Sequence, residues 1–287
     1  MSISTNCMIV NLSMGAWQGY RLDKLASKQV TDNAGANDDA ARVNKHLIPR
    51  EALKAVTTAY GLIRAHLYAK TLPWKDNGDR VLTRKMYASF MTQHEVLVGE
   101  FNDAVEVFLT RTYPEARARA EFRMGTLFDE NDYPNAEELR GKFYVNLSID
   151  AVTEASDFRV TLDDAAVAEI QASMDAAMNA RLGRAMADVW DRLSQTLTHF
   201  VTKLGDETAV FRDTTITNLQ ELVEILPGLN LTSDTNMTRI YKELRALVSS
   251  CTPKELRKDK DMRDGVVAEA ADIMETMKGF MRSFGGV

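Results

Sequence analysis

Hydrophobic positions recur every three or four residues over an unusually long stretch of the chain, residues 161–204. The members of this stripe are Val167, Ile170, Met174, Met178, Leu182, Met186, Val189, Leu193, Leu197, Phe200 and Leu204. This spacing predicts one long amphipathic helix, with Asp163 or Thr161 as its N-cap and Gly205 near its end. The period is roughly 3.7 residues, which disfavours a left-handed coiled coil.

The predicted helix would be roughly 60 Å long, about twice the width of a small domain. Part of it would therefore reach beyond its own core. Two interpretations stay open: a core helix of a bundle, or a helix along which copies of the chain associate. The second predicts a homo-oligomer.

Two short segments have the alternation and composition of β-strands. Residues 8–13 read MIVNLS and residues 143–149 read FYVNLSI, so the tetrapeptide VNLS occurs in both. We expect these strands to be similar and paired. Residues 157–161, DFRVT, predict a third strand.

Helical periodicity returns in several other segments, namely residues 53–67, 84–112, 115–127, 218–226, 237–248 and 253–284. We expect Pro114 and the Pro227-Gly228 pair to end helices. The predicted fold class is mainly α with a small antiparallel β-sheet (α+β). We expect two domains: a mixed α/β domain over residues 1–160, and the long helix with a helical region over residues 161–287.

Composition and charge narrow the function. With 45% hydrophobic and 26% charged residues the chain is typical of globular proteins, and its net charge of −6 argues against a protein that coats nucleic acid indiscriminately. The charge is uneven, because residues 1–100 hold 13 Lys and Arg against 9 Asp and Glu. A mildly basic front could hold phosphates while the acidic remainder repels them.

The sequence contains no recognisable motif of catalysis, metal binding or membrane insertion. The four histidines form no i, i+4 pair, and the scattered glycines form no phosphate-binding loop. We therefore expect no enzyme, no cofactor and no metal site. Cys7 and Cys251 lie at opposite ends of the chain, and no apolar run or secretion signal is evident. These features predict a protein of the cytoplasm, without contact to a membrane.

Cations and aromatic residues are concentrated within 24 residues of the chain, from Arg64 to Tyr87. The cluster comprises Arg64, Tyr68, Lys70, Trp74, Lys75, Arg80, Arg84, Lys85 and Tyr87. Cations that neutralise phosphates, beside rings on which bases stack, are what a surface for single-stranded nucleic acid requires. This interpretation needs Trp74 to face water; the alternative is a solvated loop whose Trp74 packs inward. A weaker candidate of the same kind comprises Trp17, Tyr20, Arg21, Lys24 and Lys28.

Short motifs distributed over the chain resemble those of a family of bacteriophage proteins. They are Asn11-Leu12-Ser13, Trp17, Leu22-Asp23-Lys24, Leu72-Pro73-Trp74, Asp76-Asn77-Gly78, Arg140-Gly141-Lys142-Phe143, Asp157-Phe158-Arg159 and Phe211-Arg212-Asp213. The family includes single-stranded-DNA-binding RNA polymerase cofactors of lytic podoviruses.

The resemblance implies a transcription cofactor in an infected bacterial cell, which binds melted promoter DNA and recruits the phage RNA polymerase. Its partners would be single-stranded DNA and that polymerase. A second class stays open, since an acidic helical protein could instead be an adaptor or assembly protein that works with a phage or host complex.

Overall fold

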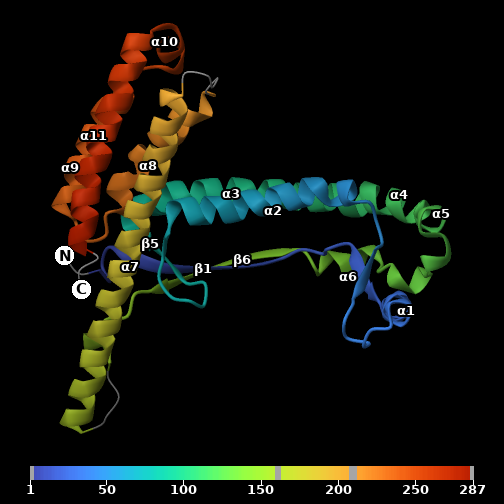
Figure 1. Ribbon diagram of the computed structural model, residues 1–287. Coiled ribbons are helices and arrows are strands. Elements are labelled where there is room, and N and C mark those ends of the chain that lie inside the picture. Colours follow the sequence, from blue (N-terminus) through green and yellow to red (C-terminus); the bar gives the residue numbers. More distant parts are fainter. Residues whose placement is uncertain (1–2, 159–162, 207–211, 285–287) are drawn as a thin grey trace. The chain divides into compact units, whose positions relative to one another are not determined.

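The computed structural model describes residues 3–158, 163–206 and 212–284, and it divides into two compact units. Unit 1 consists of Met1–Asn11, Lys70–Phe90 and Ser148–Val287, and unit 2 of Leu12–Ala69 and Met91–Leu147. Residues 1–160 therefore contribute to both units. The fold is mainly helical with a small antiparallel sheet, which confirms the predicted class (Figure 1).

The long helix is present as α7, Asp164–Gly205, and it organises unit 1. Asp163 is its N-cap and accepts a hydrogen bond from the backbone N–H of Ala166 at 2.9 Å, as expected. Helix α7 packs against α8 (Thr214–Leu229) and α11 (Lys260–Phe284), and α9 (Thr235–Ser249) packs against α8 and α11 (Figure 1). The short helix α10 (Pro253–Lys258) precedes α11.

Proline and glycine end fewer of these helices than expected. Helix α8 continues through Pro227 to Leu229. Residues 253–284 do not form one helix, because Asp259 separates α10 from α11. Pro227 removes one backbone donor from the last turn of α8, and the helix ends two residues later, at Leu229.

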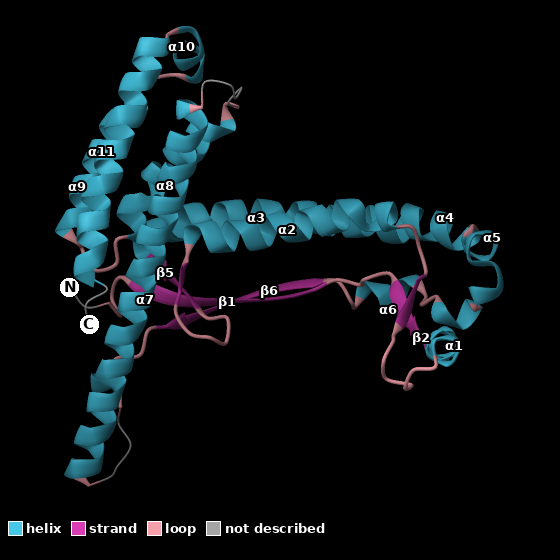
Figure 2. Cartoon of the chain, in the orientation of Figure 1, coloured by secondary structure: helices cyan, strands magenta, loops and turns pink. Residues whose placement is uncertain are grey.

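Four strands form the sheet, in the order β4-β5-β1-β6 (magenta in Figure 2). They are β1 (Cys7–Gly15), β4 (Leu72–Pro73), β5 (Arg80–Thr83) and β6 (Tyr144–Ala151). The two segments that share VNLS are thus neighbouring strands, as predicted. In the antiparallel pair of β1 and β5, Cys7 is opposite Thr83 and Val10 is opposite Arg80.

The third predicted strand, residues 157–161, is wrong at its start. Asp157 ends a short 3-10 turn, Ala155–Asp157, that Glu154 and Asp157 close with a capping box. The turn forms because both acidic side chains accept backbone N–H groups, which competes with a strand. Residues 159–161 lie outside the described residues.

Unit 2 is built on parts of two helices, α2 (Lys54–Lys70) and α3 (Arg84–Val107). Strands β2 (Tyr20–Asp23) and β3 (Val43–His46) form a second antiparallel pair, with helix α1 (Lys24–Ala34) between them in the chain. Short helices α4 (Tyr113–Ala118), α5 (Ala120–Met124) and α6 (Ala136–Arg140) complete the unit.

Pro114 does not end the helix before it. A π-helical turn, Phe108–Thr112, joins α3 to α4, and Pro114 lies in the first turn of α4. Pro114 follows the π-turn directly, where i→i+5 pairing replaces the regular α-helical pairing that a proline interrupts.

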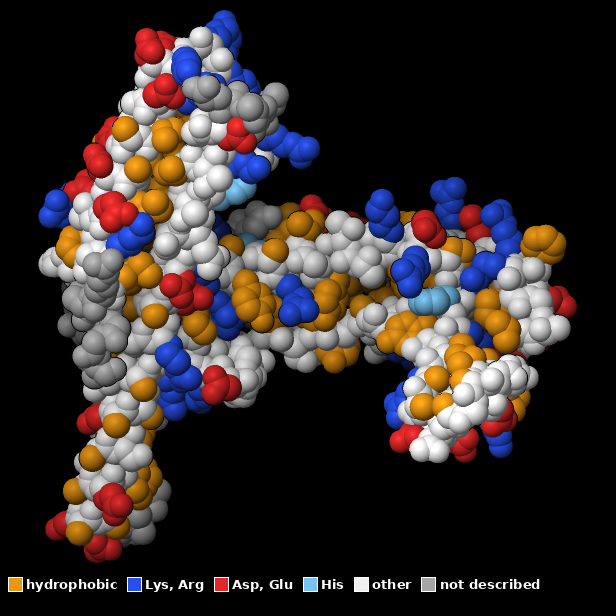
Figure 3. Space-filling model, in the orientation of Figure 1, with side chains coloured by type: hydrophobic (Ala, Val, Ile, Leu, Met, Phe, Trp, Pro, Cys, Tyr) orange, Lys and Arg blue, Asp and Glu red, His pale blue; other side chains and the backbone are white. Residues whose placement is uncertain are grey.

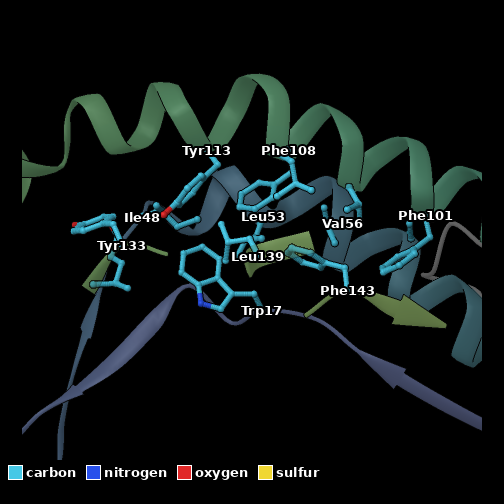
Figure 4. Close-up of a cluster of buried hydrophobic side chains, with 14 of the residues drawn as sticks. Trp17, Ile48, Leu53, Val56, Phe101, Phe108, Tyr113, Tyr133, Leu139 and Phe143 are labelled. Carbon is cyan, nitrogen blue, oxygen red and sulfur yellow. The ribbon is translucent and has the colours of Figure 1, made fainter. Parts of the chain in front are cut away.

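The core of unit 2 is aromatic (Figure 4). Trp17 packs edge-on against Tyr113, with ring centroids 5.6 Å apart, and lies 6.2 Å from the ring of Phe108. The ring of Phe143 meets Phe108 at 5.7 Å. Segments distant in sequence are therefore held together by ring contacts, which add to the free energy of burying their area.

Within the part of the chain that the structure describes, every helix is too short or too polar to span a lipid bilayer.

Candidate nucleic-acid interface

Trp74, the aromatic residue on which the first candidate depended, is buried. Its side chain is only 3% exposed, and its backbone N–H donates to the carbonyl oxygen of Asp79 at 3.0 Å across the turn between β4 and β5. The expectation that this indole faces water is wrong. The turn itself forms as predicted around Asn77 and Gly78, but strand β4 packs against α7, and Trp74 packs inward with it.

Arg80, a predicted phosphate contact, is buried as well. Its Nε donates to the hydroxyl of Thr71 at 2.6 Å, and its Nη2 donates to the carbonyl oxygen of Thr71 at 2.8 Å. The side chain is 7% exposed as a residue, so its charge serves the β4-β5 hairpin. A guanidinium that is buried and hydrogen-bonded in this way cannot contact the phosphate of a nucleic acid at the protein surface.

Two further cations of this cluster, Lys70 and Lys75, are poorly suited to hold a phosphate. Lys75 is exposed but pairs with Asp79 at 3.3 Å, while Lys70 is half-buried. Burial alone would raise the pKa of Asp79, yet hydrogen bonds from Asn11, Asn77 and Lys75 hold it below its ordinary value. The carboxylate therefore stays ionised and opposes phosphate binding at Lys75.

Arg64 and Tyr68 belong to unit 2, and the members of the cluster from Lys70 to Tyr87 belong to unit 1. Its guanidinium lies over the ring of Tyr68, 6.0 Å from the centroid. A cation that already covers the ring leaves one face of Tyr68 for other contacts.

The second candidate also loses its tryptophan. Trp17 is 9% exposed in the core of unit 2, because the apolar rings around it outweigh the polar sequence that surrounds it in the chain. Arg21 pairs with Asp132 at 2.6 Å. Lys24 and Lys28 are exposed on α1, and Tyr20 is 45% exposed and packs edge-on to His46.

Three predicted residues meet the requirements of an interface: Arg84, Lys85 and Tyr87. They occupy the first turn of α3 in unit 1, and all three are exposed. Among the described residues, neither Arg84 nor Lys85 has an ion-pair partner. Their charges are therefore available to a ligand.

Lys85 lies on the wall of a groove, which we call the Lys85 groove. Two adjoining hollows of about 90 and 210 Å³ share Lys85, Pro227, Asn230 and Ser233. Arg84 and Thr83 line the first hollow, and Tyr241 and Thr238 line the second. The Thr83 hydroxyl donates to the carbonyl oxygen of Gly228 at 2.9 Å, which holds the residue before α3 against the last turn of α8.

The exposed side of α9 adjoins the Lys85 groove. A third, shallow hollow on this helix shares Thr238 with the second and is lined by Thr235, Arg239, Lys242 and Glu243. Among the described lining residues of the three hollows, Glu243 provides the sole carboxylate, and it pairs with Arg239 at 2.9 Å. The groove thus has an excess of positive charge on a chain whose net charge is −6.

Sequence reasoning predicted the helix over residues 237–248 but missed its cations and Tyr241 as site residues. The signal was present, since Arg239, Tyr241, Lys242 and Arg245 fall within two turns of one helix. Their proximity to Lys85 depends on how α8 and α9 return to the start of α3, which no local pattern encodes.

Other chemistry is limited by the side chains present. Among residues 3–158, 163–206 and 212–284, no three His, Cys, Asp or Glu side chains gather as metal ligands would.

The chain matches no family model, no curated protein and no solved structure.

Proposed function

We propose that this protein binds single-stranded DNA in the Lys85 groove. The observation that carries the proposal is the presence of Arg84, Lys85, Lys242 and Tyr241 along one groove of unit 1. It retains the predicted class of function but moves its centre away from Trp74.

The charge of the groove suits a phosphate backbone. Arg84 and Lys85 stand at the N-terminal end of α3, where the helix dipole adds positive potential. Lys242 supplies a further cation along the path of a strand. Because phosphate contacts provide most of the affinity of such interfaces, binding should weaken strongly with added salt.

Tyr241 gives a reason to prefer a single strand. Its ring is half-buried on the groove wall, and the hydroxyl accepts a hydrogen bond from Nη1 of Arg245 at 3.2 Å, which holds the ring in place. A base can stack on such a ring only when it is not enclosed in a duplex. Tyr87, 40% exposed in the first turn of α3, offers a second ring.

The resemblance to phage transcription cofactors extends this proposal. By that resemblance the bound strand would be a melted promoter, and the bound protein would recruit the phage RNA polymerase. The site residues proposed here rest on the groove alone.

Fluorescence anisotropy with single- and double-stranded oligonucleotides tests the proposal. We expect tighter binding to the single strand, with log affinity falling linearly as log salt rises. The Lys85→Ala/Lys242→Ala variant should weaken binding and reduce the slope by about 1.4, since each lost phosphate contact removes ~0.7 for single strands.

A double variant with the same change in net charge, Lys75→Ala/Lys203→Ala, is the matched control, because neither lysine lines the groove. Equal losses in both double variants would place binding elsewhere. Absence of salt-dependent binding to single strands would refute the function itself.

A second candidate, a helical adaptor or assembly protein, is favoured by exposed apolar side chains of unit 2. Phe122 is 96% exposed on α5, and Leu25 is 78% exposed on α1. An exposed phenylalanine is an anchor that protein partners bury. If this candidate is right, purified partner protein will bind after nuclease treatment, and Phe122→Ser will weaken that binding without changing the affinity for DNA.

A further inference from the structure

The first half of α7 has no buried side chain. Helix α7 begins at Asp164, yet its first buried residue is Ala185, so about 30 Å of helix is at most partly covered, with the 3-10 turn Ala155–Asp157 packed against α7 on one side. Figure 1 shows this part of unit 1 extending away from α8, α9 and α11. We call residues 164–184 the exposed half of α7.

An apolar stripe runs along the exposed half. Val167, Ile170, Met174, Met178 and Leu182 follow each other at helical spacing, and all five are partly exposed. An open hollow of about 440 Å³ is lined by Gln171, Asp175 and the stripe residue Met178 on α7 and by the 3-10 turn at Ala155, which packs against α7 on that side. Removing the exposed part of these apolar side chains from water is favourable, so a partner over this stripe would be stabilising.

Charge is distributed unequally along the same helix. Asp163 and Asp164 stand at its N-terminal end, and Arg181 stands near the other end of the exposed half. Figure 3 shows acidic side chains at the N-terminal end and basic ones where α7 meets the rest of unit 1. Asp163 and Arg181 are eighteen residues apart, about five turns, so they flank the stripe on the same side.

We infer that the exposed half of α7 pairs antiparallel with the same segment of a second copy of this chain. In the antiparallel register, Val167 faces Met178 of the second copy and Ile170 faces Met174 of the second copy. The same register brings Asp163 to Arg181 of the second copy, at both ends of the interface. Among the described residues Arg181 has no ion-pair partner within its own chain.

A parallel pairing does not have this property. It would place Asp163 beside Asp163 of the second copy and Arg181 beside Arg181, so like charges would meet at both ends. The antiparallel arrangement is isologous and closes after two copies, which predicts a dimer and no filament. The inference goes beyond DNA binding, because the groove is complete within one chain.

Cysteine crosslinking distinguishes the two registers in the full-length protein. The Val167→Cys and Met178→Cys proteins should each give little crosslinked dimer alone, and an equimolar mixture should give abundant heterodimer under mild oxidation. In a parallel dimer each protein would crosslink with itself, and mixing would add nothing.

Ala172→Cys is the matched control, since Ala172 is exposed near the centre of the segment on the side away from the stripe. It should not crosslink, and the unsubstituted protein should not either, because Cys7 and Cys251 are buried. Sedimentation velocity should show that Ile170→Asp/Met174→Asp weakens association, so that this variant dimerises only at a concentration at least ~10-fold higher than wild type. A wild type that sediments as a monomer at tens of micromolar, or self-crosslinking of Val167→Cys, overturns the inference.

Discussion

The guanidinium of Arg80 bonds to both oxygens of Thr71, and both residues are buried. Nε lies 2.6 Å from the Thr71 hydroxyl, and Nη2 lies 2.8 Å from the Thr71 carbonyl oxygen. Nη2 of Arg192, in α7, donates to the same carbonyl at 3.0 Å. Two arginines thus join the β4-β5 hairpin to the long helix, and neither is arranged to hold a phosphate.

Replacement of Arg80 by Ala should therefore destabilise the fold. A buried group that loses its hydrogen-bond partner costs about 1–3 kcal/mol, and we expect the free energy of unfolding to fall by that amount. Urea denaturation followed by circular dichroism measures it. Arg84→Ala, four residues along and exposed, is the control and should change stability by less than ~0.5 kcal/mol. Equal stability of the two variants would contradict the structural role of Arg80.

Stability should also fall in mild acid because of His94. This side chain is buried on α3 in unit 2, and burial, followed by the charge of His66, lowers its pKa below the ordinary 6.5, while Glu95 opposes the shift. The unfolded chain then binds the proton more tightly than the folded one. The free energy of unfolding should decrease as pH falls below 6.5, and this decrease should end once the folded-state pKa is passed.

His94→Gln should flatten that dependence between pH 7.5 and 5.5, whatever it does to stability at neutral pH. His199, exposed on α7, is the control position, and His199→Gln should keep the wild-type slope. Urea midpoints at several pH values are the measurement. An unchanged slope in the His94→Gln protein would assign the acid sensitivity to other groups.

The features that the sequence predicted correctly depend on local periodicity. The stripe from Val167 to Leu204 predicts α7 because the spacing of apolar residues is retained throughout the helix. The shared VNLS segments predict neighbouring strands because alternation and β-forming residues are local properties. In both cases the tertiary structure agrees with the preference of the segment itself.

The site residues were predicted less well, since exposure depends on distant segments. The sequence around Trp74 is polar and cationic, but its hairpin packs against α7. Arg192 of α7 donates to the carbonyl oxygen of Thr71 although more than a hundred residues separate the two in the chain. In the same way Lys85 and Tyr241 line one hollow only because α8 and α9 return to the start of α3. The density of charge along the chain could suggest which segments bind phosphate, but it could not show which cations lie together on one exposed surface.

Tyr241 provides a prediction for the proposed DNA interface. If a base stacks on its ring, Tyr241→Ala should weaken binding to single-stranded DNA by about 1–3 kcal/mol, and the salt dependence should stay almost unchanged because no cation is lost. Tyr241→Phe keeps the ring and loses only the hydrogen bond from Arg245, so it should bind nearly as wild type. Anisotropy titrations at two salt concentrations separate these effects. Similar losses in both variants would indicate that the hydroxyl, and not the ring, is required.

Tryptophan fluorescence tests the burial that moved the candidate site. The chain has three tryptophans, and Trp17, Trp74 and Trp190 are 9%, 3% and 2% exposed. Iodide, a charged quencher that does not enter protein cores, should therefore quench little of the native emission. A hairpin that opened to place Trp74 in water would instead make about one third of the emission accessible, and Trp74→Phe would abolish that fraction. Because the two arrangements differ in this single indole, an accessible third would return the DNA surface to the hairpin and remove the reason for preferring the Lys85 groove.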